Sequence, residues 1–373
     1  MCLAKAPSKS KRKKIKLANK KITELQEPQP KKSAPRRYDQ STLYEIFGLE
    51  VPNGDSQINK SIVPSGDELI DKEDRVLRCA LQNPNGIRLR DNVDVLPEVA
   101  AMERLQIDMA AFPESKLTEH GRTREVLQRQ LRVRIGSAQV QNAAAPRRNT
   151  RNSDFQPGGV LMAITGRVTG RILKNGNDPW GRFSWSLLRG NRDEGILFIG
   201  AYRVCQLKGT KAGPDTAFMQ QVEGMIDEEL RDSSAAEAAD KCLTSSIRRS
   251  MDPRDRILQD LKQLINEYRS KGFRPILFMD ANEDWTNKKS GKALRDFLQE
   301  TSLQDPLYER FKGAGLTAST YSRGSRRIDY MFFDQSLLSA IKRIGTLGLH
   351  EAIVSDHVML YVDLDEKELF KVL

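Results

Sequence analysis

Cysteine is scarce in this chain, and the positions of the few cysteines exclude two kinds of stabilised small domain. The four cysteines, Cys2, Cys79, Cys205 and Cys242, are far apart in 373 residues, and no two of them form a Cys-x-x-Cys pair. Structural zinc sites and disulfide frameworks need cysteines at short, paired spacings. We therefore expect buried free thiols and a fold that depends on its apolar core.

Long apolar runs are also absent. No run approaches the roughly 20 residues that a membrane-spanning helix needs, and the N-terminal stretch MCLAKAPSKSKRKKIKLANKK lacks the apolar centre of a secretory signal. Its positive residues are mostly lysines, which argues against a mitochondrial presequence. We expect no membrane span, and an intracellular, nuclear location.

Negative charge is scarce in one part of the chain only. Of 61 Lys and Arg and 50 Asp and Glu in the whole chain, residues 1–40 hold 13 and 3, so the rest of the chain is close to neutral. KSKRKKIK and PKKSAPRR are typical of nuclear import signals and of segments attracted to nucleic-acid phosphates; a solvated arm without a specific partner is the alternative. We expect residues 1–71 to form a disordered basic arm and linker, with a short docking helix at 41–49, before a folded domain over 72–373.

Short apolar runs recur after residue 72, and each has the length and composition of a β-strand. They are RVLRCALQN, GGVLMAIT, GILFIGAYRV, RPILFMDAN, RRIDYMFFD and AIVSDHVMLYV. Amphipathic helices are expected between them, at 93–108, 251–273 and 291–303. In the second helix Asp252 is the expected cap, Pro253 the first residue and Gly272 the end.

Two stretches interrupt this pattern: 136–159 has the composition of a loop, and 213–249 is helix-prone but poor in large apolar residues. Strands interleaved with helices indicate an α/β or α+β fold.

Acids, amides and a histidine stand at the ends of these runs or within them. They are Asn83, Glu114, Asp280, Asn282, Asp329, Asp356 and His357. Polar groups at strand ends are where α/β proteins place their chemistry. Each also has a structural explanation: an Asx turn or helix cap for DAN, a solvated loop for the glutamate, and a structural hydrogen bond for the Asp–His pair.

The order and kinds of these residues resemble a known family. QNPNGI, PES, GAYRVCQ, MDANED, RRIDYMFF and SDHVML follow one another as in the endonuclease/exonuclease/phosphatase superfamily, which includes pancreatic-type DNases, apurinic/apyrimidinic endonucleases and the endonuclease domains of non-LTR retrotransposons. AYRVCQ followed by GTKAGPDTAFMQQ is more similar to the retrotransposon branch. The resemblance covers about 76–364. It implies an α+β fold, a two-layer sandwich of mixed β-sheets flanked by helices (the DNase-like four-layer α/β sandwich), with 72–373 as the catalytic domain.

The resemblance also implies a bound divalent cation. Glu114 would be the principal ligand of Mg²⁺, or Mn²⁺, with Asn83 beside it and Asp356 on the same side. Hard oxygen ligands suit these ions, which keep several waters and share phosphate oxygens with the protein.

Five further residues would then act in phosphodiester hydrolysis. His357 would lie near the phosphorus as general base or as phosphate donor, and Asp329 would hold its imidazole in one tautomer. Asp280 would position the attacking water, Asn282 would donate to a nonbridging oxygen, and Tyr202 would contact the phosphate.

One departure from the family falls beside these residues. After Tyr202 the repair enzymes carry Pro-Asn, whereas this chain continues Arg-Val-Cys-Gln. Cys205 or Gln206 therefore stands near the expected asparagine, and Gln206 is a partial substitute for it. An intact site is the interpretation that we favour, and a decayed member of the family is the alternative.

Weaker signals lie next to the motifs. Arg323, Arg326 and Arg327 in SRGSRR form a basic loop that would bind a nucleic-acid backbone, with a solvated turn as the alternative. Trp180 and Trp185 would stack on bases or, as we favour, pack in the core.

The sequence thus predicts a Mg²⁺- or Mn²⁺-dependent endonuclease that cleaves nucleic acid, DNA rather than RNA, by metal-assisted attack of water, and that acts as a monomer. The alternatives are a phosphatase or phosphodiesterase of inositol phosphates, lipids or nucleotides, and a nucleic-acid-binding protein that has lost activity. The sequence indicates neither a base or abasic-site preference nor an origin in a mobile element.

Overall fold

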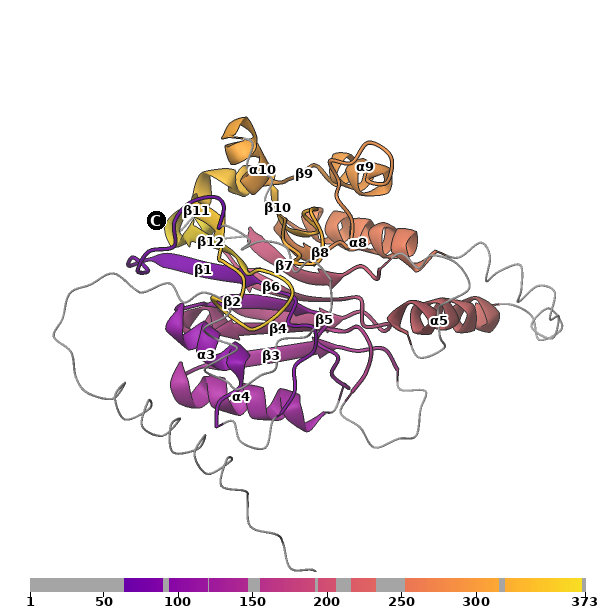
Figure 1. The fold of residues 1–373 in the computed structure, drawn as a ribbon, viewed down its shortest axis with the longest axis horizontal. Helices are drawn as coiled ribbons and strands as arrows, with labels where there is room; N and C mark the ends of the chain where they lie inside the picture. The colour runs from indigo at the N-terminus through magenta and orange to yellow at the C-terminus, as the bar shows by residue number, and fades with distance from the viewer. Residues whose placement is uncertain are drawn as a thin grey trace, which may run out of the picture. The chain divides into compact units, whose positions relative to one another are not determined.

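The computed structural model describes residues 64–89, 94–119, 121–146, 155–191, 194–205, 216–232, 252–314 and 319–370 (Figure 1). All of them belong to one compact unit, Ile58–Leu373. The basic arm, the helix expected at 41–49 and Gln206 lie outside the described residues. Within the described ranges no helix is both long enough and apolar enough to cross a membrane.

The first β-sheet has six strands in the order β11-β12-β1-β2-β4-β3. Its strands are β1 (Val76–Leu81), β2 (Met109–Pro113), β3 (Ala138–Ala143), β4 (Val160–Thr165), β11 (Ile341–Thr346) and β12 (Leu360–Asp365). β1 and β2 are parallel, and the other neighbours are antiparallel.

The second sheet also has six strands, in the order β5-β6-β7-β8-β10-β9. They are β5 (Ile172–Asn177), β6 (Phe183–Arg189), β7 (Gly195–Tyr202), β8 (Phe273–Asp280), β9 (Leu303–Gln304) and β10 (Asp329–Asp334). Here β7 and β8 form the parallel pair. Both sheets are therefore mixed, as predicted.

The two sheets pack face to face through an apolar core. Leu77, Leu81 and Met162 of the first sheet share one buried cluster with Phe198 and Phe278 of the second. The rings of Phe198 and Phe278 meet edge to face, with centroids 5.1 Å apart. Burial of each such side chain contributes roughly 1.5–3 kcal/mol, so this layer supplies much of the folding free energy.

Helices cover the outer face of each sheet. In Figure 1, α3 (Pro97–Arg104) and α4 (Arg122–Arg134) lie together on one side of the strands, and α8 (Pro253–Arg269) and α9 (Lys292–Thr301) lie on the opposite side. Val99 and Leu127 pack with Phe112 of the first sheet, whereas Leu261 and Phe297 pack with strands of the second. The remaining helices are α5 (Ala217–Asp232), α10 (Pro306–Phe311) and α11 (Glu366–Phe370), with 3-10 turns at Gly166–Arg171, Lys312–Ala314 and Gln335–Ala340. The predicted four-layer sandwich is confirmed.

The α8 helix forms for the reasons that its sequence indicates. The Asp252 carboxylate accepts a hydrogen bond of 2.8 Å from Arg254 N, and Pro253 occupies the first turn. Such a cap contributes about 1 kcal/mol because it satisfies a free N–H of the first turn. Ile257, Leu261 and Ile265 are among the buried residues of its inner face.

Three expectations for the chain are corrected. The stretch 136–159, expected to be a loop, contains strand β3, whose Gln141 and Asn142 are buried but hydrogen-bonded. The last strand begins only at Leu360, so Asp356 and His357 lie in the preceding loop rather than within a strand. Residues 64–71, assigned to the linker, include Ser65, whose backbone N–H bonds the Thr346 hydroxyl at 2.9 Å at the end of β11.

Candidate active site

Several predicted residues meet where strands of the second sheet end or begin. Asp280 ends β8 and Asp329 begins β10, and the two are paired directly across these antiparallel strands. Tyr202 ends β7 and pairs with Asp280 from the other side. Three neighbouring strands therefore place an acid, an acid and a phenol side by side.

His357 lies against Asp329. Its Nδ1 is 2.8 Å from Asp329 Oδ2, and both residues are buried. The Tyr321 ring packs 4.9 Å from the imidazole, and the Thr320 hydroxyl accepts hydrogen bonds from Ile328 N and Asp329 N. Because Nδ1 is engaged by the carboxylate, Nε2 is the nitrogen available to a ligand.

Asn83 joins the two sheets at this point. Its Nδ2 donates to Glu114 Oε2 at 3.0 Å and to Asp280 Oδ2 at 2.8 Å. The Ser355 hydroxyl donates to the Asn83 carbonyl at 2.6 Å, which connects this residue to the loop that carries His357. Hydrogen bonds therefore join Glu114, Asp280 and the loop of His357 in one cluster of side chains, although these residues come from different sheets and distant parts of the sequence.

The oxygen atoms around Glu114 fit a hard divalent cation. Glu114 Oε1 lies 3.0 Å from the Lys116 ammonium, so this carboxylate already accepts a positive charge, and the same ammonium donates to Asn85 Oδ1. Asp356 is linked to this group through Asn85 Nδ2, 3.5 Å from its Oδ1. Glu114 and Asp356 offer the carboxylate oxygens that Mg²⁺ and Mn²⁺ prefer. Asn83 turns its Nδ2 to Glu114, and its Oδ1 accepts from Asn85 N at 2.8 Å, so its amide would have to reorient to bind a cation at Glu114.

A second group of possible ligand atoms lies next to the first. One atom each of Asp280, Asp329 and His357 come within 4.8 Å of one another, and all three residues are buried. Asp329 Oδ1 has no hydrogen-bond partner among the described residues, so this side of the pocket has a free acceptor.

Four residues in or beside the predicted site have left-handed backbone conformations, which are uncommon for residues other than glycine. Asn85, Glu114, Lys116 and Asn282 all have φ between 49° and 56°, in the left-handed region. Each such residue costs of the order of 1 kcal/mol, and they cluster at functional sites. Gly159, with φ of 84°, lies against the Glu114 loop, where a Cβ would come within 2.9 Å of the Ser115 hydroxyl.

Both polar atoms of the Asn282 side chain are engaged. Its Nδ2 donates to the Arg203 carbonyl at 2.9 Å, and its Oδ1 accepts from the Cys205 thiol at 2.9 Å. Its backbone N–H donates to Asp280 Oδ1 at 3.0 Å, which makes the Asx turn expected for DAN. The buried Tyr202 hydroxyl hydrogen-bonds the same thiol.

Burial and neighbouring charges shift the pKa values of Asp280 and His357 across the neutral range. Burial, with the negative charge of Asp329, raises the pKa of Asp280 to about 8. Burial alone would lower the pKa of His357, but the charge of Asp329 and its hydrogen bond raise the pKa to about 10. At neutral pH the imidazole is therefore a cation, and Asp280 carries a proton that it loses at slightly alkaline pH.

The three arginines of the predicted basic loop differ in exposure. Arg323 and Arg326 are exposed, and Arg323 Nε lies 3.7 Å from Asp356 Oδ2 at the edge of the pocket. Arg327 is buried, pairs with Asp305 at 2.7 Å and packs over the Tyr330 ring. Arg327 therefore stabilises the fold beside the site, and its guanidinium faces away from solvent.

The tryptophans belong to the core, as we favoured. Trp180 and Trp185 are 7% and 8% exposed. The guanidinium of Arg182 covers the Trp180 ring at 4.2 Å, and Trp185 packs on Tyr268 with centroids 5.0 Å apart.

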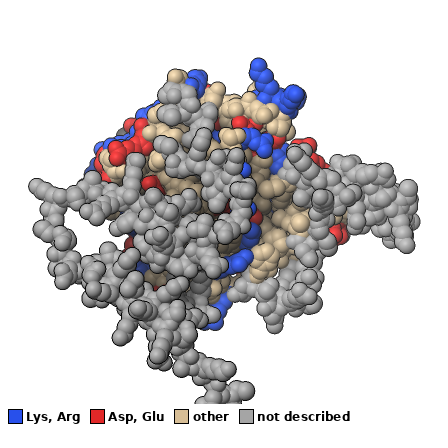
Figure 2. Space-filling view, viewed as in Figure 1, with Lys and Arg blue, Asp and Glu red and all other residues tan. Residues whose placement is uncertain are grey.

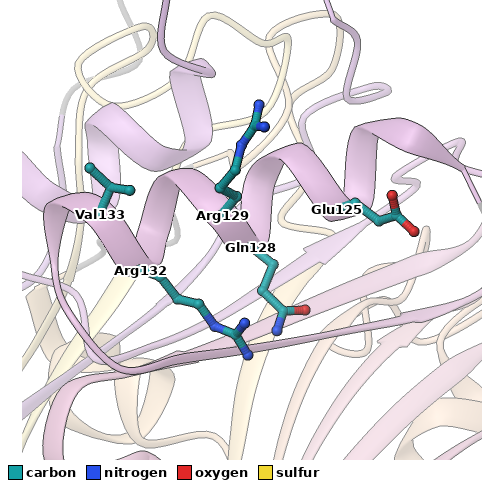
Figure 3. Close-up of a pocket in the computed structure, with 5 residues that line it drawn as sticks. All are labelled: Glu125, Gln128, Arg129, Arg132 and Val133. Atoms are coloured by element: carbon teal, nitrogen blue, oxygen red, sulfur yellow. The ribbon is translucent and has the colours of Figure 1, made fainter.

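A surface hollow elsewhere contains none of the predicted site residues. It lies along the outer face of α4 and is lined by Glu125, Gln128, Arg129, Arg132 and Val133 (Figure 3). The predicted site residues at the strand ends therefore lie outside this hollow.

Sequence reasoning missed three residues of the site. Lys116 and Asn85 contact the predicted cation ligands Glu114 and Asp356, and Gln82 donates to the carbonyls of Ile353 and His357 at 3.0 and 2.9 Å. A lysine two residues after the expected metal ligand was the available signal for Lys116. Nothing in the sequence indicates that Gln82 holds the His357 loop.

Comparisons with known proteins agree with this fold. A scan against protein-family models finds no match, and neither does a search of curated proteins. Among solved structures, the AP endonuclease LMAP from Leishmania major matches with a TM-score of 0.51 and 15% identity, over 78% of this chain and 88% of that chain. The chain therefore has a DNase-like α/β sandwich.

Two further structures match less closely. The human Nocturnin catalytic domain with bound sulfate has a TM-score of 0.48 and 12% identity, over 80% of this chain and 96% of that chain. The 3′ phosphatase NExo from Neisseria, bound to a product DNA hairpin, has a TM-score of 0.46 and 13% identity, over 78% of this chain and 99% of that chain. The fold of the endonuclease/exonuclease/phosphatase superfamily, which the sequence resemblance implied, is thus confirmed by the Leishmania structure.

Proposed function

We propose that this protein is a divalent-metal-dependent phosphodiesterase that cleaves nucleic acid, DNA in preference to RNA, as an endonuclease. One observation carries the proposal. Asn83 bonds Glu114 on one side and Asp280 on the other, and Asp280 lies beside the Asp329–His357 pair. This connection places the proposed cation ligand Glu114, the acid Asp280 and the imidazole of His357 in one cluster, where they would act on a single phosphate group.

The side chains suggest how the reaction would be divided among them. His357, whose pKa is about 10, is a cation at neutral pH, so its Nε2–H is better suited to donate to a phosphate oxygen than to act as a base. Asp280, whose pKa is about 8, would orient the attacking water and accept its proton in its ionised form, which becomes the main form at slightly alkaline pH. Asn282 and Tyr202 would contact the nonbridging oxygens.

The cation would be Mg²⁺ or Mn²⁺, held by Glu114 and Asn83 with Asp356 on the same side. Such an ion would offset the negative charge that builds up on the phosphate oxygens. The protein residues around it keep the phosphate between that charge and the imidazolium.

Nucleic acid as the substrate is supported by charge and by the fold. Arg323 and Arg326 are exposed at the edge of the pocket, and residues 1–40 are strongly basic. In the view of Figure 2 the Lys and Arg side chains of the described residues lie in separate groups. By sequence, residues 1–40 hold 13 Lys and Arg against 3 Asp and Glu, so the basic arm carries most of the net positive charge. The Leishmania neighbour is named an AP endonuclease, and the basic clusters suggest a nuclear location.

The test is nicking of supercoiled plasmid by the purified chain, with Mg²⁺ and with EDTA. We expect metal-dependent nicking, and at least about a 100-fold loss of rate in His357→Ala and in Asp280→Asn with plasmid binding kept. His350→Ala is the matched control, because it removes a half-buried loop histidine that is not among the proposed catalytic residues and feels the site only through the charge of Asp356. Nicking that resists EDTA, or full activity in either site variant, would refute the assignment.

A second panel separates nuclease from small-molecule hydrolase. Inositol phosphates, phosphoinositides and nucleotides are offered under the same conditions. Phosphate release from these compounds at a higher kcat/KM than from DNA would overturn the nucleic-acid assignment but keep the phosphoesterase chemistry.

A further inference from the structure

The Asn282 amide is held at both ends by the short segment that follows β7, residues 203–205. The Arg203 carbonyl can only accept, so it must face Nδ2, 2.9 Å away. That orientation leaves Oδ1 opposite Cys205 Sγ, also at 2.9 Å. The arrangement is favourable only if the sulfur carries its proton, and its raised pKa of about 11 agrees with a protonated thiol.

The segment that makes these two contacts is itself anchored. Arg203 and Arg254 both pair with Glu283, and all three residues are at least nine-tenths buried. The Arg254 guanidinium also donates to the Val204 carbonyl, and Arg203 Nε donates to the Arg254 carbonyl at 2.9 Å. Residues 203–205 are therefore tied to the residue that follows Asn282.

This geometry leaves one amide hydrogen of Asn282 for the pocket. A terminal amide rotates broadly about its last side-chain torsion, so one contact alone would not fix its direction. With Oδ1 and one Nδ2–H engaged, the other Nδ2–H has a single direction. Preorganised donors of this kind are effective because they need no rearrangement when charge develops on the reacting group.

We propose that Cys205 is a positioning residue, whose thiol orients the Asn282 amide toward the phosphate in the proposed reaction. The inference rests on the proposed function for its effect on rate. The orientation of the amide can be measured without any substrate. Cys205 thus performs a positioning task at the point where the chain departs from the Pro-Asn of the repair enzymes.

The substrate-free test uses the full chain labelled with ¹⁵N-asparagine. The Asn282 side-chain signals are identified by their loss in Asn282→Ser. We expect Cys205→Ala to shift or broaden them, and Cys205→Ser, which keeps a donor, to restore a single sharp pair. Unchanged signals in Cys205→Ala would overturn the inference whether or not the protein cleaves DNA.

The kinetic test follows plasmid nicking at saturating Mg²⁺. We expect kcat to fall about tenfold in Cys205→Ala, which corresponds to about 1.4 kcal/mol, with KM changed less than about twofold and with most of the loss recovered in Cys205→Ser. Cys242→Ala is the control for loss of a thiol elsewhere. In an Asn282→Ala background, Cys205→Ala should have no further effect, because the two residues act as one unit.

The outcomes separate the two proposals. Equal loss in the alanine and serine variants, or full additivity with Asn282→Ala, would overturn the positioning role. If the wild type cleaves nothing while the amide signals respond as expected, the proposed function fails and the positioning of Asn282 by Cys205 is upheld.

Discussion

Replacing Asp280 by Asn should abolish cleavage and at the same time stabilise the metal-free protein at alkaline pH. In the folded protein the pKa of this carboxyl is about 8, whereas an unfolded chain gives about 3.9. The folded state therefore holds the proton more tightly, and its stability falls as the pH rises between these two values. Below about pH 4 the carboxyl has no such effect, and above about pH 8 the effect is complete.

The size of the effect follows from the same values. A difference of about four pKa units, at about 1.4 kcal/mol each, sets a ceiling of about 6 kcal/mol at pH 9. Asp280 accepts hydrogen bonds from Asn83 Nδ2 and from Asn282 N. An asparagine has one carbonyl oxygen for these two donors, and loss of one bond costs about 1 kcal/mol. We therefore expect a net gain of about 2–4 kcal/mol at pH 9 and close to none at pH 5.

The assay is urea unfolding in EDTA at pH 5, 7 and 9, followed by tryptophan fluorescence. Asp334→Asn is a control of opposite sign, because hydrogen bonds from Ser336 and Arg269 lower the pKa of Asp334 below its usual value despite partial burial. That variant should lose stability at neutral pH, and the loss should disappear as the pH falls below about 4. A gain for Asp280→Asn that is equal at pH 5 and pH 9, or a loss at pH 9, would refute the reasoning.

Three other perturbations test separate parts of the structure. Asp329→Asn should lower the pKa of His357 from about 10 toward its usual range, so the imidazole, a cation at pH 8 in the wild type, should titrate at lower pH by NMR in EDTA; an unchanged midpoint would mean that other groups set it. Lys116→Met should tighten Mn²⁺ binding several-fold by calorimetry, because the ammonium then no longer competes at Glu114, and weaker binding would show that the lysine helps to build the site. Deletion of residues 1–40 should flatten the salt dependence of DNA binding with little change in kcat at saturating substrate; an equal salt slope would show that the arm does not contact the polyanion.

Strand identity and helix ends were readable from the sequence because their causes are local. β8 and β10 are short runs of apolar residues that end or begin in an aspartate, and α8 has its Asp-Pro start within adjacent positions. A resemblance in residue order then indicated which strand ends meet. The hydrogen bonds of Asp329 to His357 and of Asn83 to Asp280 follow from that topology.

What the sequence did not disclose depends on partners that are distant along the chain. β3 has the composition of a loop but forms a strand. Its buried Gln141 is tolerated because its side chain donates a hydrogen bond to Ser186 of the other sheet. Arg327 has the same composition signal as Arg323, but Asp305 at the start of α10 draws it into the interior. No local pattern specifies either contact, since each is fixed only when the layers pack.

The chain runs from the first sheet into the second and back again, and both sheets contribute residues of the proposed site. Asn83 and Glu114 follow strands of the first sheet, whereas Asp280 and Asp329 lie in strands of the second. In a refolding experiment, the recovery of secondary structure would therefore not report whether the site has formed. Activity should return only after the two sheets have packed against each other. The rate at which activity returns would therefore measure this last step of folding.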